Sequence, residues 1–156
     1  MSHGPTARSD YTILEQAAPE VLNALRALGQ AVDQSGLEKE LTELLKVRAS
    51  QINGCAFCLQ YHLNLARKLD IAAAKLDLVA VWEETSLYSP RERAALAWTE
   101  ALTRMNQQAV GDEVYRDLQV QFSQSEILFL TSAIGAINAW NRIAGGLLFT
   151  PPIPKG

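Results

Sequence analysis

Apolar residues recur at intervals of three and four along almost the whole chain, a spacing that places them on one face of a helix. In the first stretch, from Pro19 to the stop signal Gly36, the apolar residues are Val21, Leu22, Leu25, Leu28 and Val32. Further helices are expected over 37–54, from about Cys55 onward, and over roughly 72–84. No stretch shows the strict alternation of a half-buried strand. The pattern predicts an all-α protein.

Two capping boxes mark the starts of later helices. Ser89-Pro90-Arg91-Glu92 places Ser at the N-cap, Pro at the first helical position and Glu at the third. Ser123-Gln124-Ser125-Glu126 repeats the box before a second apolar run. Asp112 is expected to cap a short helix between them, and Gly145-Gly146 to end the last helix. We expect about six or seven helices in total.

The length of 156 residues corresponds to about one domain. Proline and glycine clusters lie at the ends of the chain, and no linker or internal repeat divides it. We expect one compact helical domain over 1–156, with its core at about 37–144. The segments 1–18 and 147–156 are expected to be extended.

The charge balance argues against two classes of partner. Lys and Arg number 14 against 17 Asp and Glu, a net charge of −3, which gives no reason to expect nucleic acid or an anionic membrane surface as a partner.

The uncharged run Ile127–Asn141 is shorter than the roughly 20 residues of a membrane span. Residues 1–10 lack the apolar core of a secretory signal, so a cytoplasmic, thiol-reducing location is expected.

The motif Cys55-Ala56-Phe57-Cys58 carries the clearest chemistry. It follows the turn pair Asn53-Gly54 and begins a helix, where backbone N–H groups and the helix dipole stabilise a thiolate. Helix positions three apart have Cα atoms about 5 Å from one another, which a disulfide tolerates. The two cysteines are therefore predicted to cycle between dithiol and disulfide.

His62 lies one helical turn after Cys58, on the same helix face. An imidazole with a free pKa of about 6.5 can accept the thiol proton and return it. Glu43 is a candidate to orient this base, because a helical hairpin about the turn places the two residues at similar heights. Glu38, Glu40 and Lys46 are also charged, and spacing alone leaves open which polar residue points inward.

Zinc is the alternative for the same residues. A structural zinc site needs four ligands, and the chain offers Cys55, Cys58, His62 and the remote His3. We expect neither a metal nor an organic cofactor. An open Cys₂His site and ligands shared between subunits are the alternatives to this expectation.

Two other groups of residues are interpreted only in part. The tryptophans are expected to lie in the core or at a subunit interface, namely Trp82, Trp98 and Trp140. A polar patch on the last helix is expected either between subunits or along a pocket, namely Asn138, Asn141 and Arg142.

Taken together, Glu43, the Cys55–Cys58 motif and His62 resemble the alkylhydroperoxidase AhpD-like group of the carboxymuconolactone decarboxylase superfamily. The resemblance covers about Leu37 to Ala144. The flanking segments that support it are 48–54, 91–100 and 137–142.

The resemblance implies an all-helical subunit that assembles into homotrimers or homohexamers. It implies a thiol peroxidase or disulfide reductase in which Cys58 attacks the peroxide, Cys55 resolves, and His62 with Glu43 forms a proton relay. The expected partners are a hydroperoxide and an external dithiol, such as a thioredoxin-like protein or a lipoyl group. Phe57 stands where the best-known members carry a second histidine, so one relay group near Cys55 is missing.

Two other functions remain as alternatives. One is a redox sensor, whose dithiol is oxidised once per event without high turnover. The other is decarboxylation of a lactone acid, which does not need a redox dithiol. Because the motif Cys55–Cys58 provides a redox dithiol, the expected function is thiol-dependent reduction of a peroxide or disulfide.

Overall fold

The computed structural model describes residues 4–156, which form helices and connecting segments and contain no strand. The elements of this part of the chain are α1 (Tyr11–Ala17), α2 (Pro19–Asp33), α3 (Lys39–Asn53), α4 (Ala56–Lys68), α5 (Ala73–Leu78), the 3₁₀ helix η1 (Val79–Glu84), α6 (Pro90–Thr103), α7 (Asp112–Gln121) and α8 (Gln124–Gly146). The all-α prediction is confirmed. The number of helices is higher than predicted, with eight α-helices in the described residues.

Helix α1 is the main correction, because the segment 1–18 was expected to be extended. The Asp10 side chain accepts a hydrogen bond from the Tyr11 backbone N–H at 2.9 Å and so caps the helix. Tyr11 and Leu14 then pack against a small cluster of buried residues that contains both cysteines. A helix of seven residues gains its stability from such packing, which the local sequence does not reveal.

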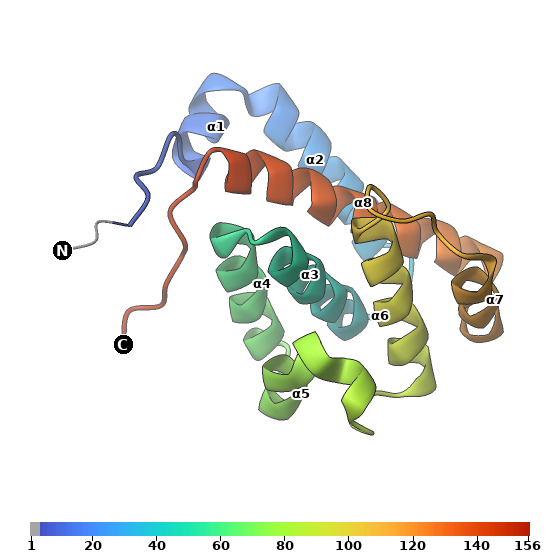
Figure 1. The fold of residues 1–156 in the computed structure, drawn as a ribbon. Coiled ribbons are helices and arrows are strands. Elements are labelled where there is room, and N and C mark those ends of the chain that lie inside the picture. Colours follow the sequence, from blue (N-terminus) through green and yellow to red (C-terminus); the bar gives the residue numbers. More distant parts are fainter. Residues whose placement is uncertain (1–3) are drawn as a thin grey trace.

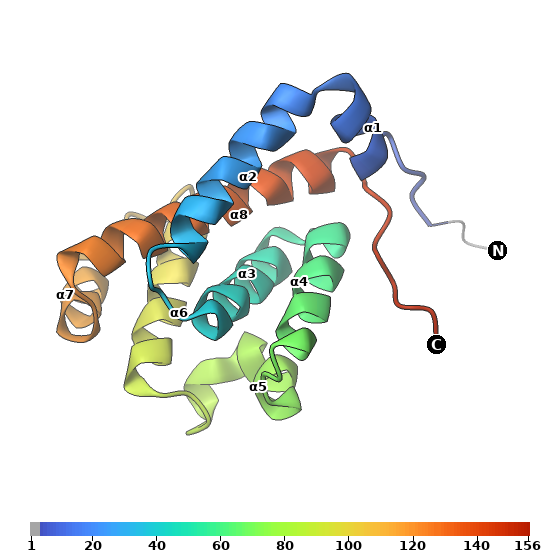
Figure 2. The same ribbon diagram turned by 180° about the vertical axis from the view of Figure 1, so that it is seen from behind.

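The long helices α2 and α8 run side by side, and α3, α4 and α6 lie together on one side of them (Figures 1 and 2). Helix α3 is the centre of this arrangement, since it contacts α4, α6, α8 and η1. Most of its length is buried, including the charged residues Glu43 and Arg48. The helices that pack around α3 therefore surround its charged side chains Glu43 and Arg48.

The helix predicted over 72–84 divides into α5 and η1, with non-helical torsion angles at Val81. Val79 and Trp82 are both buried, and a 3₁₀ helix places residues three apart on the same side. The Trp82 ring nitrogen donates to Glu100 Oε1 at 3.0 Å. The tighter helix thus allows both side chains to reach the interior.

Both predicted capping boxes are confirmed. Ser89 Oγ accepts from the Glu92 backbone N–H at 3.2 Å while Glu92 Oε2 accepts from the Ser89 N–H at 2.8 Å, and Ser123 and Glu126 make the same pair of bonds. Asp112 is the first residue of α7 rather than its cap, because Gly111 is the extended residue at that end.

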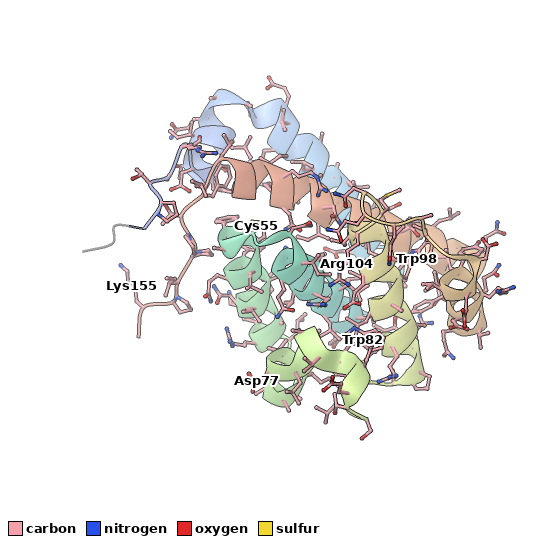
Figure 3. The ribbon with its side chains drawn as sticks, viewed as in Figure 1. Cys55, Asp77, Trp82, Trp98, Arg104 and Lys155 are labelled. Carbon is pink, nitrogen blue, oxygen red and sulfur yellow. A yellow bond between two sulfur atoms is a disulfide. The ribbon has the colours of Figure 1, made fainter. Side chains whose placement is uncertain are left out.

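Trp82 and Trp98 are buried within the subunit, where Trp98 donates to Thr131 Oγ1 at 3.0 Å (Figure 3). Trp98 therefore adds little apolar surface for contact with another subunit.

Among residues 4–156, every helix is too short or too polar to cross a bilayer.

Candidate active site

The turn between α3 and α4 positions the cysteine motif. Gly54 ends α3 with a φ of 67°, a left-handed conformation that glycine adopts without a steric penalty. The Cys55 backbone N–H donates to the Ser50 carbonyl at 3.1 Å. Cys55 becomes the N-cap of α4, and its sulfur accepts from the Cys58 backbone N–H at 3.2 Å. The helix start therefore provides the thiolate-stabilising position that the sequence predicts.

Cys55 and Cys58 form a disulfide, with Cα atoms 5.3 Å apart. The prediction that one turn of chain brings the two sulfurs together is confirmed. Both residues are almost fully buried. The structure is that of the oxidised pair.

The two cysteines have different neighbours. Cys58 lines a pocket together with His62, and its sulfur lies 3.7 Å from the Trp140 carbonyl oxygen. Cys55 is not part of the pocket lining and lies against Gly145 of α8. A Cβ at Gly145 would come to 3.6 Å from the Cys55 Cβ. Of the two cysteines, Cys58 is thus the one that lines the pocket.

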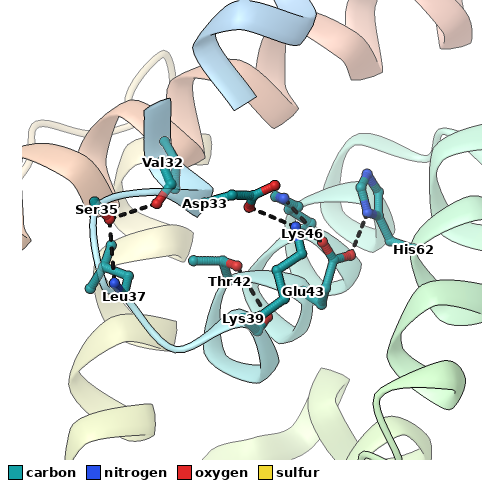
Figure 4. A network of polar contacts seen from close by, with 9 residues as sticks. All are labelled: Val32, Asp33, Ser35, Leu37, Lys39, Thr42, Glu43, Lys46 and His62. Atoms are coloured by element: carbon teal, nitrogen blue, oxygen red, sulfur yellow. Dashed lines mark hydrogen bonds and ion pairs between the residues drawn. The ribbon is translucent and has the colours of Figure 1, made fainter. Parts of the chain in front are cut away.

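His62 and Glu43 form the contact that the hairpin geometry predicts. His62 Nδ1 lies 2.7 Å from Glu43 Oε2, across the interface of α3 and α4 (Figure 4). Glu43 is the inward-pointing residue among the charged candidates on this helix, with none of its surface exposed. Glu38 instead pairs with Arg91 at 2.9 Å, and Glu40 is exposed.

Two lysines of α3 hold the other oxygen of Glu43 (Figure 4). Lys46 Nζ lies 3.1 Å and Lys39 Nζ 3.2 Å from Glu43 Oε1. Burial alone would raise the pKa of Glu43, but the hydrogen bond from His62 and the positive charges outweigh burial and lower the pKa to about 2. Glu43 is therefore ionised at neutral pH.

Burial lowers the pKa of His62 below its ordinary value, and the charges of Lys46 and Lys39 act in the same direction. The hydrogen bond with Glu43 opposes this shift without overcoming it. A neutral imidazole beside an ionised carboxylate donates through Nδ1–H, which leaves Nε2 with a free lone pair. This arrangement gives His62 the tautomer of a general base.

The pocket has a volume of about 290 Å³ and lies among α1, α2, α3, α4 and α8. Aromatic side chains form much of its wall, namely Tyr11, Phe57, Tyr61 and Trp140. Its charged residues come from α2 and α3, namely Arg26, Asp33, Lys39, Glu43 and Lys46. Lining of this kind, apolar with a few polar groups, is typical of a small-molecule site.

Phe57 occupies the position between the cysteines as part of an aromatic stack. Its ring lies 6.2 Å from that of Tyr11 and 6.0 Å from that of Tyr61, with the Phe149 ring edge-on at 5.5 Å. The residue therefore contributes packing and a pocket wall, and it supplies no titratable group.

The polar residues of α8 have a role that sequence reasoning missed. Asn53, the last residue of α3, donates to Asn138 Oδ1 at 2.9 Å and to Asn141 Oδ1 at 2.8 Å. Asn141 also donates to Ser50 Oγ at 3.0 Å, and Arg142 donates to the Asn138 carbonyl at 3.0 Å. The bonds of Asn53 and Ser50 fix the end of α3, and hence the cysteine turn, on α8, whereas the Arg142 bond lies within α8. No sequence signal identified Ser50 or Asn53 as partners.

The zinc alternative finds no ligand cluster in the described residues. Within 4–156, no three His, Cys, Asp or Glu side chains gather in a way that would hold a metal ion. His3, the fourth ligand considered, lies outside the described residues.

A family model for carboxymuconolactone decarboxylases matches residues 19–101, a range that contains Glu43, both cysteines and His62. The chain belongs to the carboxymuconolactone decarboxylase family. The uncharacterized protein YdfG of Bacillus subtilis is 34% identical over 129 residues, which span 83% of this chain and 88% of YdfG.

Solved structures agree with this membership. An Agrobacterium tumefaciens protein of unknown function, described as a candidate antioxidant defence protein AhpD, is 40% identical with a TM-score of 0.89 over 96% of this chain and 100% of that one. An uncharacterized peroxidase-related protein from Ralstonia eutropha with an alkylhydroperoxidase AhpD core shares the fold at 19% identity, with a TM-score of 0.78 over 98% of this chain and 100% of that one. The protein is an AhpD-like member of its family, as the motif predicts.

Proposed function

We propose that the protein is a thiol-dependent peroxidase and disulfide reductase that uses Cys58 and Cys55 as a redox pair. The observation that carries the proposal is that Cys58 and His62 line the same pocket, and that the buried Glu43 holds the imidazole of His62. A cysteine beside a base that a third group orients is the general pattern of an activated nucleophile.

The first step consumes the hydroperoxide. Nε2 of His62 takes the proton of the Cys58 thiol, and the resulting imidazolium is stabilised by Glu43. The thiolate attacks the terminal peroxide oxygen, the O–O bond breaks, and the alkoxide leaves as an alcohol with the proton returned by His62. Cys58 is now a sulfenic acid, and the peroxide has been reduced by two electrons.

The second step forms the disulfide seen in the structure. The Cys55 thiol attacks the sulfur of the Cys58 sulfenic acid, the S–O bond breaks, and the hydroxyl leaves as water. The Cys58 backbone N–H donates to the Cys55 sulfur and stabilises the negative charge that develops there as the Cys55 proton passes to the leaving hydroxyl. One peroxide and two thiols thus give one alcohol, one water and one disulfide.

An external dithiol closes the cycle by exchange through a mixed disulfide. A thioredoxin-like protein and a lipoyl group both carry the required dithiol, and the reducing cytoplasm is the compartment that keeps such donors reduced. Decarboxylation of a lactone acid uses no such donor, and the paired cysteines favour the redox reaction over it.

Peroxide consumption with a panel of dithiol donors tests the proposal. Dithiothreitol, dihydrolipoamide and a thioredoxin system are each supplied with cumene hydroperoxide, and the Cys58→Ser protein is the matched control. We expect many turnovers that require Cys58, together with an intact mass after alkylation that shows loss of both free thiols. Consumption of a single equivalent of peroxide would indicate a sensor, and consumption equal to that of the control would contradict the proposal.

A further inference from the structure

The pocket at Cys58 is far larger than hydrogen peroxide requires. A water molecule takes about 30 Å³ of liquid volume, against a pocket of about 290 Å³. Aromatic and aliphatic side chains line the part of the pocket that the charged residues of α2 and α3 do not. The space fits a hydroperoxide with an organic group.

The charges of the pocket are unevenly paired. Glu43 is held by His62, Lys39 and Lys46, and Lys39 also contacts Asp33 at 2.7 Å. Arg26, the remaining cation of the lining, has a longer ion pair: its Nη2 lies 3.6 Å from Glu15 Oε1, and both side chains are about half exposed.

Arg26 and Tyr11 form a pair of hydrogen-bond donors at the α1–α2 side of the pocket. Arg26 Nη2 donates to the Tyr11 hydroxyl at 2.6 Å. Because the Tyr11 oxygen is the acceptor in this bond, its own hydrogen is free to donate to another group. The guanidinium has five N–H donors, and its other polar neighbour is the half-exposed Glu15 at 3.6 Å, a contact that solvent weakens.

Gly29 leaves space beside this pair. It lies three residues after Arg26 on α2 and lines the pocket, and a Cβ at this position would meet no atom within 4 Å. Glycine destabilises a helix interior relative to alanine, and the packing of the subunit does not require it here. The glycine therefore leaves open space in the wall of the pocket that Arg26 and Cys58 also line.

We propose that the substrate is an organic hydroperoxide that carries a carboxylate, which Arg26 and Tyr11 bind while the hydroperoxide reaches Cys58. Planar carboxylates match the fork of an arginine, and such charge-assisted bonds are stronger than neutral ones. The apolar body of the substrate lies along Gly29 and the aromatic wall. This inference rests on the proposed peroxidase function and names the substrate class for the same site.

A matched pair of substrates tests the carboxylate. The probes are 4-(2-hydroperoxypropan-2-yl)benzoic acid and its methyl ester, which differ in charge but share the reacting group. We expect kcat/KM for the acid to exceed that for the ester at least tenfold, and the Arg26→Gln protein to lower this ratio to within twofold. Arg67→Gln, an exposed arginine outside this pocket, is the control and should retain the preference. Equal rates for acid and ester, or a preference that survives Arg26→Gln, would overturn the inference.

A binding measurement separates this inference from the peroxidase proposal. Calorimetric titration with 4-isopropylbenzoate, which carries the carboxylate and no peroxide, should give at least tenfold weaker binding to Arg26→Gln than to the unmodified protein. Tyr11→Phe should weaken binding less, because it removes one of the two donors. If 4-isopropylbenzoate binds through Arg26 but no peroxide is turned over, the site stands and the peroxidase function fails. If peroxide is turned over but Arg26→Gln binds 4-isopropylbenzoate as tightly as the unmodified protein, the carboxylate site fails alone.

Discussion

Glu43 Oε2 lies 2.7 Å from His62 Nδ1, although the two residues are 19 positions apart and belong to different helices. The tight turn at Gly54 folds α4 back along α3 and brings the two side chains to the same height. The carboxylate is fully buried and ionised, so it fixes the imidazole ring and its tautomer. Nε2 is thereby left with a free lone pair, as the proposed transfer of the thiol proton requires.

The first prediction concerns this relay. His62→Ala should raise the pKa of the Cys58 thiol and slow its alkylation at pH 7 by about 10²–10⁴-fold, the usual contribution of a general base. Glu43→Gln should also raise the pKa of the Cys58 thiol and slow its alkylation, but by a smaller factor. The glutamine keeps a hydrogen-bond partner for Nδ1 but lacks the charge that stabilises the imidazolium. Alkylation rate against pH, in a Cys55→Ser background with a single thiol, measures both effects.

The control is Glu40→Gln, which removes an exposed carboxylate from the same helix and should leave the profile unchanged. The deficit of the His62 variant should shrink at high pH, where the thiol ionises unaided, and circular dichroism should show intact helices in each variant. An alkylation profile that is the same with and without His62 would remove the relay and leave the start of α4 as the source of thiol activation.

The second prediction separates the roles of the two cysteines. Cys55→Ser should leave Cys58 able to react once with peroxide and to accumulate a sulfenic acid that a dimedone probe traps. Cys58→Ser should lose the first step, because Cys55 lies outside the pocket lining against α8. Mass spectrometry of the trapped adduct identifies the residue. Reaction of the Cys58→Ser protein at the original rate would reverse the assignment.

The local features of this site could be predicted from the sequence, since spacing alone relates the cysteines, His62 and the turn at Gly54. The same holds for the capping boxes at Ser89 and Ser123, which need only neighbouring residues. The choice of Glu43 over nearby charged residues needed the helical hairpin as an added assumption.

The features that could not be predicted depend on contacts between distant segments. Helix α1 forms because Tyr11 has an aromatic wall to pack against, and this wall comes from α4 and α8. The bonds from Asn53 to α8 join residues 85 and 88 positions apart, and an asparagine before a glycine is equally consistent with a simple turn. In both cases contacts between distant segments decide the structure, and a local signal such as the Asp10 cap of α1 is too weak to predict it alone.

The third prediction concerns stability in acid. The pKa of Glu43 is about 2 in the folded protein against an ordinary value of 4.5, so the unfolded chain binds the proton first as the pH falls. The ionised Glu43 therefore adds to the free energy of unfolding above about pH 4.5, and this contribution is lost as the pH falls toward 2. At about 1.4 kcal/mol for each unit of pKa, the contribution is of the order of 3 kcal/mol. The lowered pKa of His62 adds a loss of the same sign, beginning near pH 6.5.

Denaturant unfolding at a series of pH values measures this effect on the oxidised protein. The free energy of unfolding should fall more steeply below pH 4.5 in the unmodified protein than in Glu43→Gln, whatever the difference between them at pH 7. Glu40→Gln serves again as the matched control and should follow the unmodified protein. Parallel slopes for the Glu43→Gln and unmodified proteins would show that this carboxylate keeps an ordinary pKa.

The last prediction is assembly into three or six subunits, which the family resemblance implies. Large apolar side chains at the junction of α7 and α8 face solvent, with Val120 78% and Leu128 64% exposed. Burying apolar surface stabilises an interface by about 25 cal/mol per Å², so each of these side chains favours contact with another copy. Light scattering at micromolar concentration should give a mass near three or six times 17.1 kDa. Leu128→Glu should lower that mass, whereas Val81→Glu, an exposed valine on η1, should not. A mass near 17.1 kDa for the unmodified protein would contradict assembly.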